Sequence, residues 1–213
     1  MSPVEKASVS ANRFAETFTV STSNGLAIRK ILIAGSGAVG KTSLVKVMKH
    51  NLPLSGIDDD TTEYHRTPFV ELETVRIKRS AKEGVFQMVD VSGQLDSVIH
   101  PLRDISRVAM GSVSVVLLMF SGSNVQSLLD LSQWIETLTD YYSKTRSKKT
   151  QDFVLLKNKA DLHDDIDQTL IDAVMNCNSR ICKYHELSCL TGEGVKEMID
   201  WLVARYMMIE EAG

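Results

Sequence analysis

The residues whose types and spacing most clearly indicate chemistry form a glycine-rich loop near the amino end. Gly35-Ser36-Gly37-Ala38-Val39-Gly40-Lys41-Thr42 matches the pattern G-x-x-x-x-G-K-[ST], with a short apolar run before it. Such a loop turns successive backbone N–H groups toward phosphate oxygens, and the helix expected to open near Lys41 adds the positive end of its dipole. Lys41 would contact the β- and γ-phosphates, and the Thr42 hydroxyl would bind Mg²⁺. The loop predicts a nucleoside triphosphate site, but it does not separate ATPase, kinase and GTPase.

A second group of candidate residues follows the apolar run at residues 85–89. Asp90-Val91-Ser92-Gly93-Gln94 places a carboxylate at the end of a buried strand, where open α/β sheets bind their ligands. Asp90 would hold Mg²⁺ through a water, the N–H of Gly93 would approach the γ-phosphate, and Gln94 would orient an attacking water. An aspartate in this position is also a common turn former or helix cap. Taken alone, Asp90 is better explained by that structural role.

A third motif, Lys157-Asn158-Lys159-Ala160-Asp161, carries information about the base. The Asp161 carboxylate accepts two parallel hydrogen bonds, and guanine offers two adjacent donors, N1–H and the N2 amine, whereas adenine has an acceptor at N1. Asp161 would therefore select GTP over ATP, because the wrong base leaves buried polar groups unpaired. Asn158 can join this loop to the phosphate loop, and the Lys159 stem can lie over the base plane.

The segment Ser188-Cys189-Leu190-Thr191-Gly192 is placed to give a backbone N–H to guanine O6. Its three candidate residues for base binding are Ser188, Cys189 and Leu190. A Thr-Gly pair before a helix is equally a cap and turn, so this loop is weak support on its own.

These residues need strands and helices to bring them together. Short, nearly continuous apolar runs at residues 31–33, 85–89, 115–120 and 153–156 are typical of strands buried on both faces of a parallel sheet. Residues 70–77, with a turn at residues 80–84, predict one further strand that pairs antiparallel with the next. Two helical stripes alternate with the strands: Leu128, Leu131, Ile135 and Leu138, and then Val195, Met198, Ile199, Leu202 and Tyr206. The pattern predicts a doubly wound α/β domain with helices on both faces of the sheet.

Length and composition exclude several classes of protein. The 213 residues allow one large domain with some extra chain, and no apolar run approaches the roughly 18 residues of a membrane span. The formal net charge of −3 gives no global electrostatic case for nucleic-acid binding. The three cysteines, Cys177, Cys182 and Cys189, form no closely spaced metal-binding pair, so we expect a reduced, cytoplasmic compartment.

In order and spacing, the four motifs resemble the nucleotide-binding motifs of a Ras-superfamily small GTPase, over about residues 28–210. The resemblance implies a P-loop NTPase fold with a mostly parallel six-stranded sheet and five helices, GTP and Mg²⁺ binding, slow hydrolysis and two mobile switches. It assigns catalysis to Gln94 and Lys41. It assigns phosphate binding to residues 35–42, Ser43, Thr67 and Gly93, and Mg²⁺ binding to Thr42, Thr67 and, through water, Asp90.

The resemblance also implies a threonine in the first switch that binds Mg²⁺, and Thr61, Thr62 and Thr67 compete for this role. Family members often carry a tyrosine three residues earlier, and Tyr64 has that spacing to Thr67. Residues 67–75 further resemble the entry to the second strand in Arf-like members. We therefore favour Thr67, which makes the switch segment at residues 51–66 longer than usual.

Two functional hypotheses follow from the sequence. The first is a switch that hydrolyses GTP and binds effector proteins in its GTP state, with an exchange factor and an activating protein as further partners. The second is a pseudo-GTPase, a scaffold or assembly subunit that binds guanine nucleotide constitutively. Lys41, Thr42 and Gln94 favour the first, and the motif ending at Asp161 disfavours a P-loop kinase or ATPase.

We expect no covalent lipid, since Ser2 replaces the glycine that myristoylation needs and the last five residues contain no cysteine. We expect membrane contact only through a partner. We divide the chain into an extension at residues 1–26, a GTPase domain at residues 27–210 and a short tail at residues 211–213. The dipeptide Asn24-Gly25 indicates a β-hairpin within the extension, and a flexible tail is the alternative.

Overall fold

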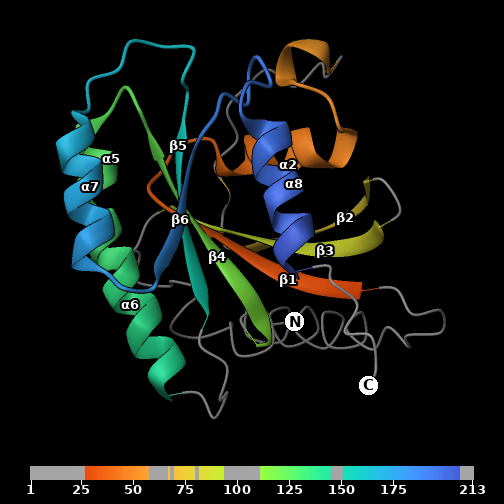
Figure 1. The fold of residues 1–213 in the computed structure, drawn as a ribbon, viewed down its shortest axis with the longest axis horizontal. Coiled ribbons are helices and arrows are strands. Elements are labelled where there is room, and N and C mark those ends of the chain that lie inside the picture. Colours follow the sequence, from red (N-terminus) through yellow and green to blue (C-terminus); the bar gives the residue numbers. More distant parts are fainter. Residues whose placement is uncertain are drawn as a thin grey trace, which may run out of the picture.

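A six-stranded sheet lies at the centre of the structure, with helices on both of its faces (Figure 1). The computed structural model describes residues 27–57, 67, 70–79, 82–93, 111–144 and 151–206. The order of the strands in the sheet is β2-β3-β1-β4-β5-β6. Among the described strands, only the pair β2 and β3 is antiparallel, and the other four neighbouring pairs are parallel. The mostly parallel, doubly wound sheet predicted from the sequence is confirmed.

The strands are β1 (Ala27–Ala34), β2 (Val70–Arg79), β3 (Lys82–Val91), β4 (Val113–Ser121), β5 (Asp152–Asn158) and β6 (Ile181–Glu186). The helices are α2 (Lys41–His50), the 3₁₀-helix η1 (Leu54–Gly56), α5 (Val125–Leu129), α6 (Leu131–Lys144), α7 (Gln168–Cys177) and α8 (Val195–Tyr206). No helix within the described ranges is long and apolar enough to cross a membrane.

Each face of the sheet carries its own apolar core. Along β4, Val115, Leu117 and Met119 pack on the face covered by α2 and α8, and Val116, Leu118 and Phe120 pack on the face covered by α5, α6 and α7 (Figure 1). Because successive side chains of a strand point to opposite faces, a strand buried on both sides needs an unbroken apolar run. This explains why the apolar runs of the sequence lack a polar alternation.

The structure corrects two local predictions. The turn predicted at residues 80–84 is too long, since β3 already begins at Lys82, and Gly84 pairs with Ile77 in the ladder and with Ala27 of β1. The first helical stripe extends over two helices, because α5 ends at Leu129 and α6 begins at Leu131. All four residues of that stripe are nevertheless buried.

Other predictions concern chain outside the described residues, including the amino-terminal hairpin and the tail at residues 211–213. Within the described part, the carboxyl ends of β1, β3 and β5 lead into the first three of the four predicted motifs. Ligands of open α/β sheets bind at this edge. The topology therefore brings the phosphate loop, Asp90 and the motif at residues 157–161 to one edge of the sheet.

Candidate functional site

The phosphate loop joins β1 to α2 and is held in shape by Lys41. This lysine is buried, and its ammonium donates to the carbonyls of Gly35 at 2.9 Å and Ser36 at 2.8 Å. Burial lowers the pKa of Lys41 to about 8, and the nearby Asp90 carboxylate partly opposes this shift. The cation therefore lies across the loop, beside the opening turn of α2, where the backbone N–H groups of a helix attract anions.

The hydroxyl and carboxyl groups of Thr42, Thr67 and Asp90 meet next to this loop. The Thr42 hydroxyl donates to Asp90 Oδ2 at 2.5 Å, and Thr42 Oγ1 lies 3.2 Å from Thr67 Oγ1. Burial raises the pKa of Asp90, although the Thr42 hydrogen bond and the Lys41 charge both work against this shift. Among the described residues, no group donates a hydrogen bond to the buried Asp90 Oδ1.

These three side chains fit a magnesium site. Mg²⁺ prefers oxygen ligands, and two hydroxyls and a carboxylate supply them from three separate segments of the chain. A buried carboxylate oxygen without a partner is costly unless a cation or a water satisfies it. As far as the described residues show, Asp90 Oδ1 is such an atom, so the donor set suits the ion that the sequence implies. The competing threonines Thr61 and Thr62 lie outside the described residues.

Gly93 approaches the phosphate loop so closely that only a glycine fits there. A Cβ atom on Gly93 would lie 2.4 Å from the backbone nitrogen of Gly37 and 2.6 Å from the carbonyl carbon of Ser36. The segment after Asp90 thus touches the middle of the phosphate loop. Gln94, the predicted water-positioning residue, lies outside the described residues.

Asn158 links the phosphate loop to the loop at residues 188–192 through both ends of its amide. Its Nδ2 donates to the Val39 carbonyl at 2.8 Å, and its Oδ1 accepts from the Cys189 N–H at 3.0 Å. Gly40 makes this possible, since a Cβ there would lie 2.2 Å from Asn158 Nδ2. The joining of the two loops expected from the sequence is present, and a single buried side chain provides it.

Asp161 lies at the surface beside Ser188, which is fully buried and donates its hydroxyl to Asp161 Oδ1. The backbone of Lys159 adopts a left-handed conformation with φ of 67°, which turns the chain between Asn158 and Asp161. Leu190 is half exposed, whereas Cys189 is buried and its thiol pKa is raised to about 12 by that burial. The thiol therefore stays protonated near neutral pH.

Two contacts of the site were not predicted from the sequence. The backbone N–H groups of Leu54 and Ser55 in η1 donate to the carbonyls of Cys189 at 3.0 Å and Leu190 at 3.2 Å. Separately, the Ser36 hydroxyl donates to Asp130 Oδ2 at 2.7 Å, which ties the phosphate loop to the junction of α5 and α6. Both contacts join segments that are far apart in the chain, and no local pattern indicates them.

Comparison with known proteins agrees with this geometry. The model of the Ras family matches residues 30–208, which include all four motifs. Ras-related protein Rab-36 from Mus musculus is 28% identical over 182 residues, which cover 84% of this chain and 62% of that protein. The chain thus spans about 62% of the length of this relative.

Proposed function

The chain belongs to the Ras family of small GTPases, and on that premise we propose that it binds GTP with Mg²⁺, hydrolyses it slowly and binds effector proteins in its GTP state. The observation that carries the proposal is the meeting of Thr42, Thr67 and Asp90 next to Lys41. Thr67 comes from the segment predicted to be the first switch. A γ-phosphate and its cation at this point would therefore hold that segment in one position, and hydrolysis would release it.

In this proposal, the Thr42 and Thr67 hydroxyls bind Mg²⁺ directly and Asp90 holds it through a water. When bound, the ion neutralises charge on the phosphate oxygens. Lys41, close enough to Asp90 for the two charges to interact, adds a second positive charge beside the loop. Because an anion favours the protonated amine, phosphate binding would raise the lowered pKa of Lys41 toward its ordinary value.

Base selection is assigned to the loop that follows β5. Asp161 would accept from guanine N1–H and the N2 amine, and Ser188 would orient its carboxylate through their hydrogen bond. The loop at residues 188–190 would offer a backbone N–H to guanine O6. Asn158 supports this assignment, since its two hydrogen bonds fix the distance between the base-reading loops and the phosphate loop.

Hydrolysis is assigned to Gln94, which would orient the attacking water while Gly93 donates its N–H to the γ-phosphate. The further proposed partners are an exchange factor and an activating protein, in a cytoplasmic signalling role, with membranes reached through a partner. The alternative is a scaffold that binds guanine nucleotide without using hydrolysis.

The proposal is tested by three measurements on the full chain: the nucleotide retained on purification, single-turnover hydrolysis of GTP, and capture of proteins by the GDP and GTP-analogue forms. We expect retained guanine nucleotide and hydrolysis on the order of 10⁻⁴ to 10⁻² s⁻¹, slower in Gln94→Leu. Gln133→Leu, on the exposed face of α6, is the matched control and should keep the wild-type rate. Equal rates in wild type and Gln94→Leu would remove Gln94 from the mechanism and favour the scaffold.

A further inference from the structure

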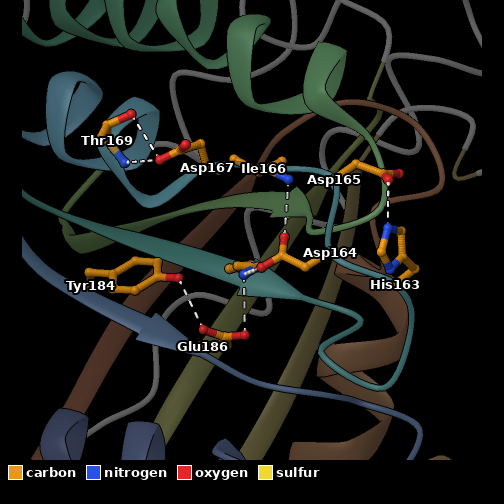
Figure 2. Close-up of polar contacts among 9 residues, drawn as sticks. His163, Asp164, Asp165, Ile166, Asp167, Thr169, Tyr184 and Glu186 are labelled. Atoms are coloured by element: carbon orange, nitrogen blue, oxygen red, sulfur yellow. Dashed lines mark hydrogen bonds and ion pairs between the residues drawn. The ribbon is translucent and has the colours of Figure 1, made fainter.

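A buried lysine, Lys157, lies at the carboxyl end of β5 directly before Asn158. Only 4% of its side chain is exposed, and its ammonium contacts two carboxylates, Asp164 Oδ2 and, at 3.2 Å, Glu186 Oε1. Figure 2 shows Asp164 and Glu186 approaching the same nitrogen from two sides. Glu186 is the direct neighbour of Lys157 across the parallel strands β5 and β6, whereas Asp164 belongs to the loop that follows β5.

The lysine remains charged in this position. Burial works to lower its pKa, but the hydrogen bonds to Asp164 and Glu186 outweigh burial, and the pKa of Lys157 is raised. The same contact lowers the pKa of Asp164. Because an unpaired buried ammonium would be very unfavourable, the two carboxylates are held to it, and so are the segments that carry them.

Those two segments carry the groups that are assigned to guanine. Asp164 is three residues after Asp161, and its second oxygen accepts from the Ile166 N–H at 3.2 Å (Figure 2). Glu186 is two residues before Ser188, whose hydroxyl donates to Asp161. The contact between Lys157 and Asp164 therefore joins the two ends of the chain segment that contains Asp161. The contact between Lys157 and Glu186 attaches this segment to β6, the strand that leads to Ser188.

Gly122, which has no side chain, leaves room for the aliphatic part of the Lys157 side chain. A Cβ on Gly122, which follows β4, would lie 2.9 Å from Lys157 Cε and 3.6 Å from Asp164 Oδ1. The Gly122 N–H donates to the Asn158 carbonyl at 2.9 Å, and its carbonyl accepts from the Asp165 N–H at 3.0 Å. Backbone contacts on both sides of the ion pairs thus hold the same loop.

We propose that Lys157 is a positioning residue for guanine selectivity: by pairing with Asp164 and Glu186 it holds the Asp161 carboxylate where it meets the N2 amine of the base. This inference rests on the proposed function, in which Asp161 reads guanine. It assigns to Lys157 a role in selecting the base, in addition to any contribution to stability.

The test compares the dissociation constants of GDP and inosine diphosphate (IDP), which lacks the N2 amine. Wild type should bind GDP more tightly than IDP. In Lys157→Met the affinity for GDP should fall about tenfold, the scale of one lost hydrogen bond to a charged group, while IDP changes much less. The ratio of the IDP dissociation constant to the GDP dissociation constant, which exceeds one in wild type, should then fall toward its value in Asp161→Ala. Lys157→Arg should restore most of the ratio, and Lys196→Met, which breaks an exposed ion pair on α8, should leave it unchanged.

Variants that remove only one of the two carboxylates keep the test decisive if Lys157→Met does not fold. Asp164→Asn and Glu186→Gln each leave the ammonium one carboxylate, and each should lower the ratio in part. Equal weakening of GDP and IDP in the Lys157, Asp164 and Glu186 variants would overturn the positioning role. An Asp161→Ala ratio equal to wild type would instead overturn the guanine assignment of the proposed function, and this inference with it.

Discussion

At the scale of single residues, the base selection that we propose depends on the carboxylate of Asp161. We predict that Asp161→Asn weakens GTP binding by about 10- to 100-fold and improves binding of xanthosine triphosphate (XTP), because the amide donates where the carboxylate accepted and xanthine has an acceptor at C2. Competition among GTP, ATP and XTP for wild type and variant measures this change. A wild type that binds GTP and ATP equally would contradict the assignment.

The Thr67 hydroxyl, 3.2 Å from the Thr42 hydroxyl, is the second single group on which the proposal depends. We predict that Thr67→Ala keeps GDP binding but loses the Mg²⁺-dependent tightening for a GTP analogue, because the hydroxyl that would link the switch to the γ-phosphate through the ion is removed while the backbone N–H remains. Titration of Mg²⁺ against analogue dissociation checks this, with Thr61→Ala and Thr62→Ala as controls. An unchanged Thr67→Ala beside an impaired Thr61→Ala or Thr62→Ala would assign the switch threonine differently.

At the scale of elements, backbone donors of η1 attach it to the carbonyls of Cys189 and Leu190, so a change of the Leu54 side chain alone does not test the contact. We predict that Leu54→Pro releases GDP roughly three- to tenfold faster than Leu54→Ala, because only proline removes the N–H that Cys189 accepts. Pro53 has an extended backbone with ψ of 156°, which suits a residue before proline, and the first helical position accepts proline. Release of a fluorescent GDP derivative is the measurement. Equal rates for the two variants would show that this hydrogen bond does not restrain the nucleotide.

The loop between β5 and α7 should also lose an interaction in acid. The pKa of Asp164 is lowered by its contact with Lys157, so its stabilising contribution is complete above the ordinary carboxyl pKa and disappears as pH falls through the lowered one. Asp164 is half exposed, so we expect Asp164→Asn to reduce the free energy of unfolding by about 1 kcal/mol or less near pH 6. Urea unfolding of both proteins from pH 6 to pH 2.5 should show the difference closing in acid. A difference independent of pH would argue against the ion pair.

The sequence predicts those elements correctly whose structure depends on residues close together in the chain. The phosphate loop needs glycines and a lysine within eight positions, and β4 needs one unbroken apolar run, so both can be read from consecutive residues. The pairing of Ser36 with Asp130 could not be predicted, since 94 residues separate them and only tertiary packing brings them together. The contact of Lys157 with Glu186 depends likewise on the register of β5 and β6. The break between α5 and α6 follows no proline or glycine, and the apolar stripe continues across it.

At the scale of the whole molecule, the site is built from loops that follow β1, β3, β5 and β6 at one edge of the sheet. A bound nucleotide should therefore stabilise the folded protein against unfolding. We predict that GDP with Mg²⁺ at 1,000 times its dissociation constant adds about 4 kcal/mol of stability, which raises Tm by roughly 8–16 °C. Thermal unfolding with and without nucleotide measures the shift, and ATP with Mg²⁺ is the control. An equal rise with ATP would contradict guanine selectivity.

The two hydrogen bonds from η1 to the carbonyls of Cys189 and Leu190 also place two binding events in one thermodynamic cycle. If these bonds hold residues 188–190 in the shape that binds the base, a protein that binds η1 only after they have opened would lower the affinity for the nucleotide, and a bound nucleotide would lower the affinity for that protein by the same factor. Two ligands would then exclude each other without sharing an atom. Reciprocity of this kind is what an exchange factor requires, because it has to expel the nucleotide and must afterwards be expelled by the next one.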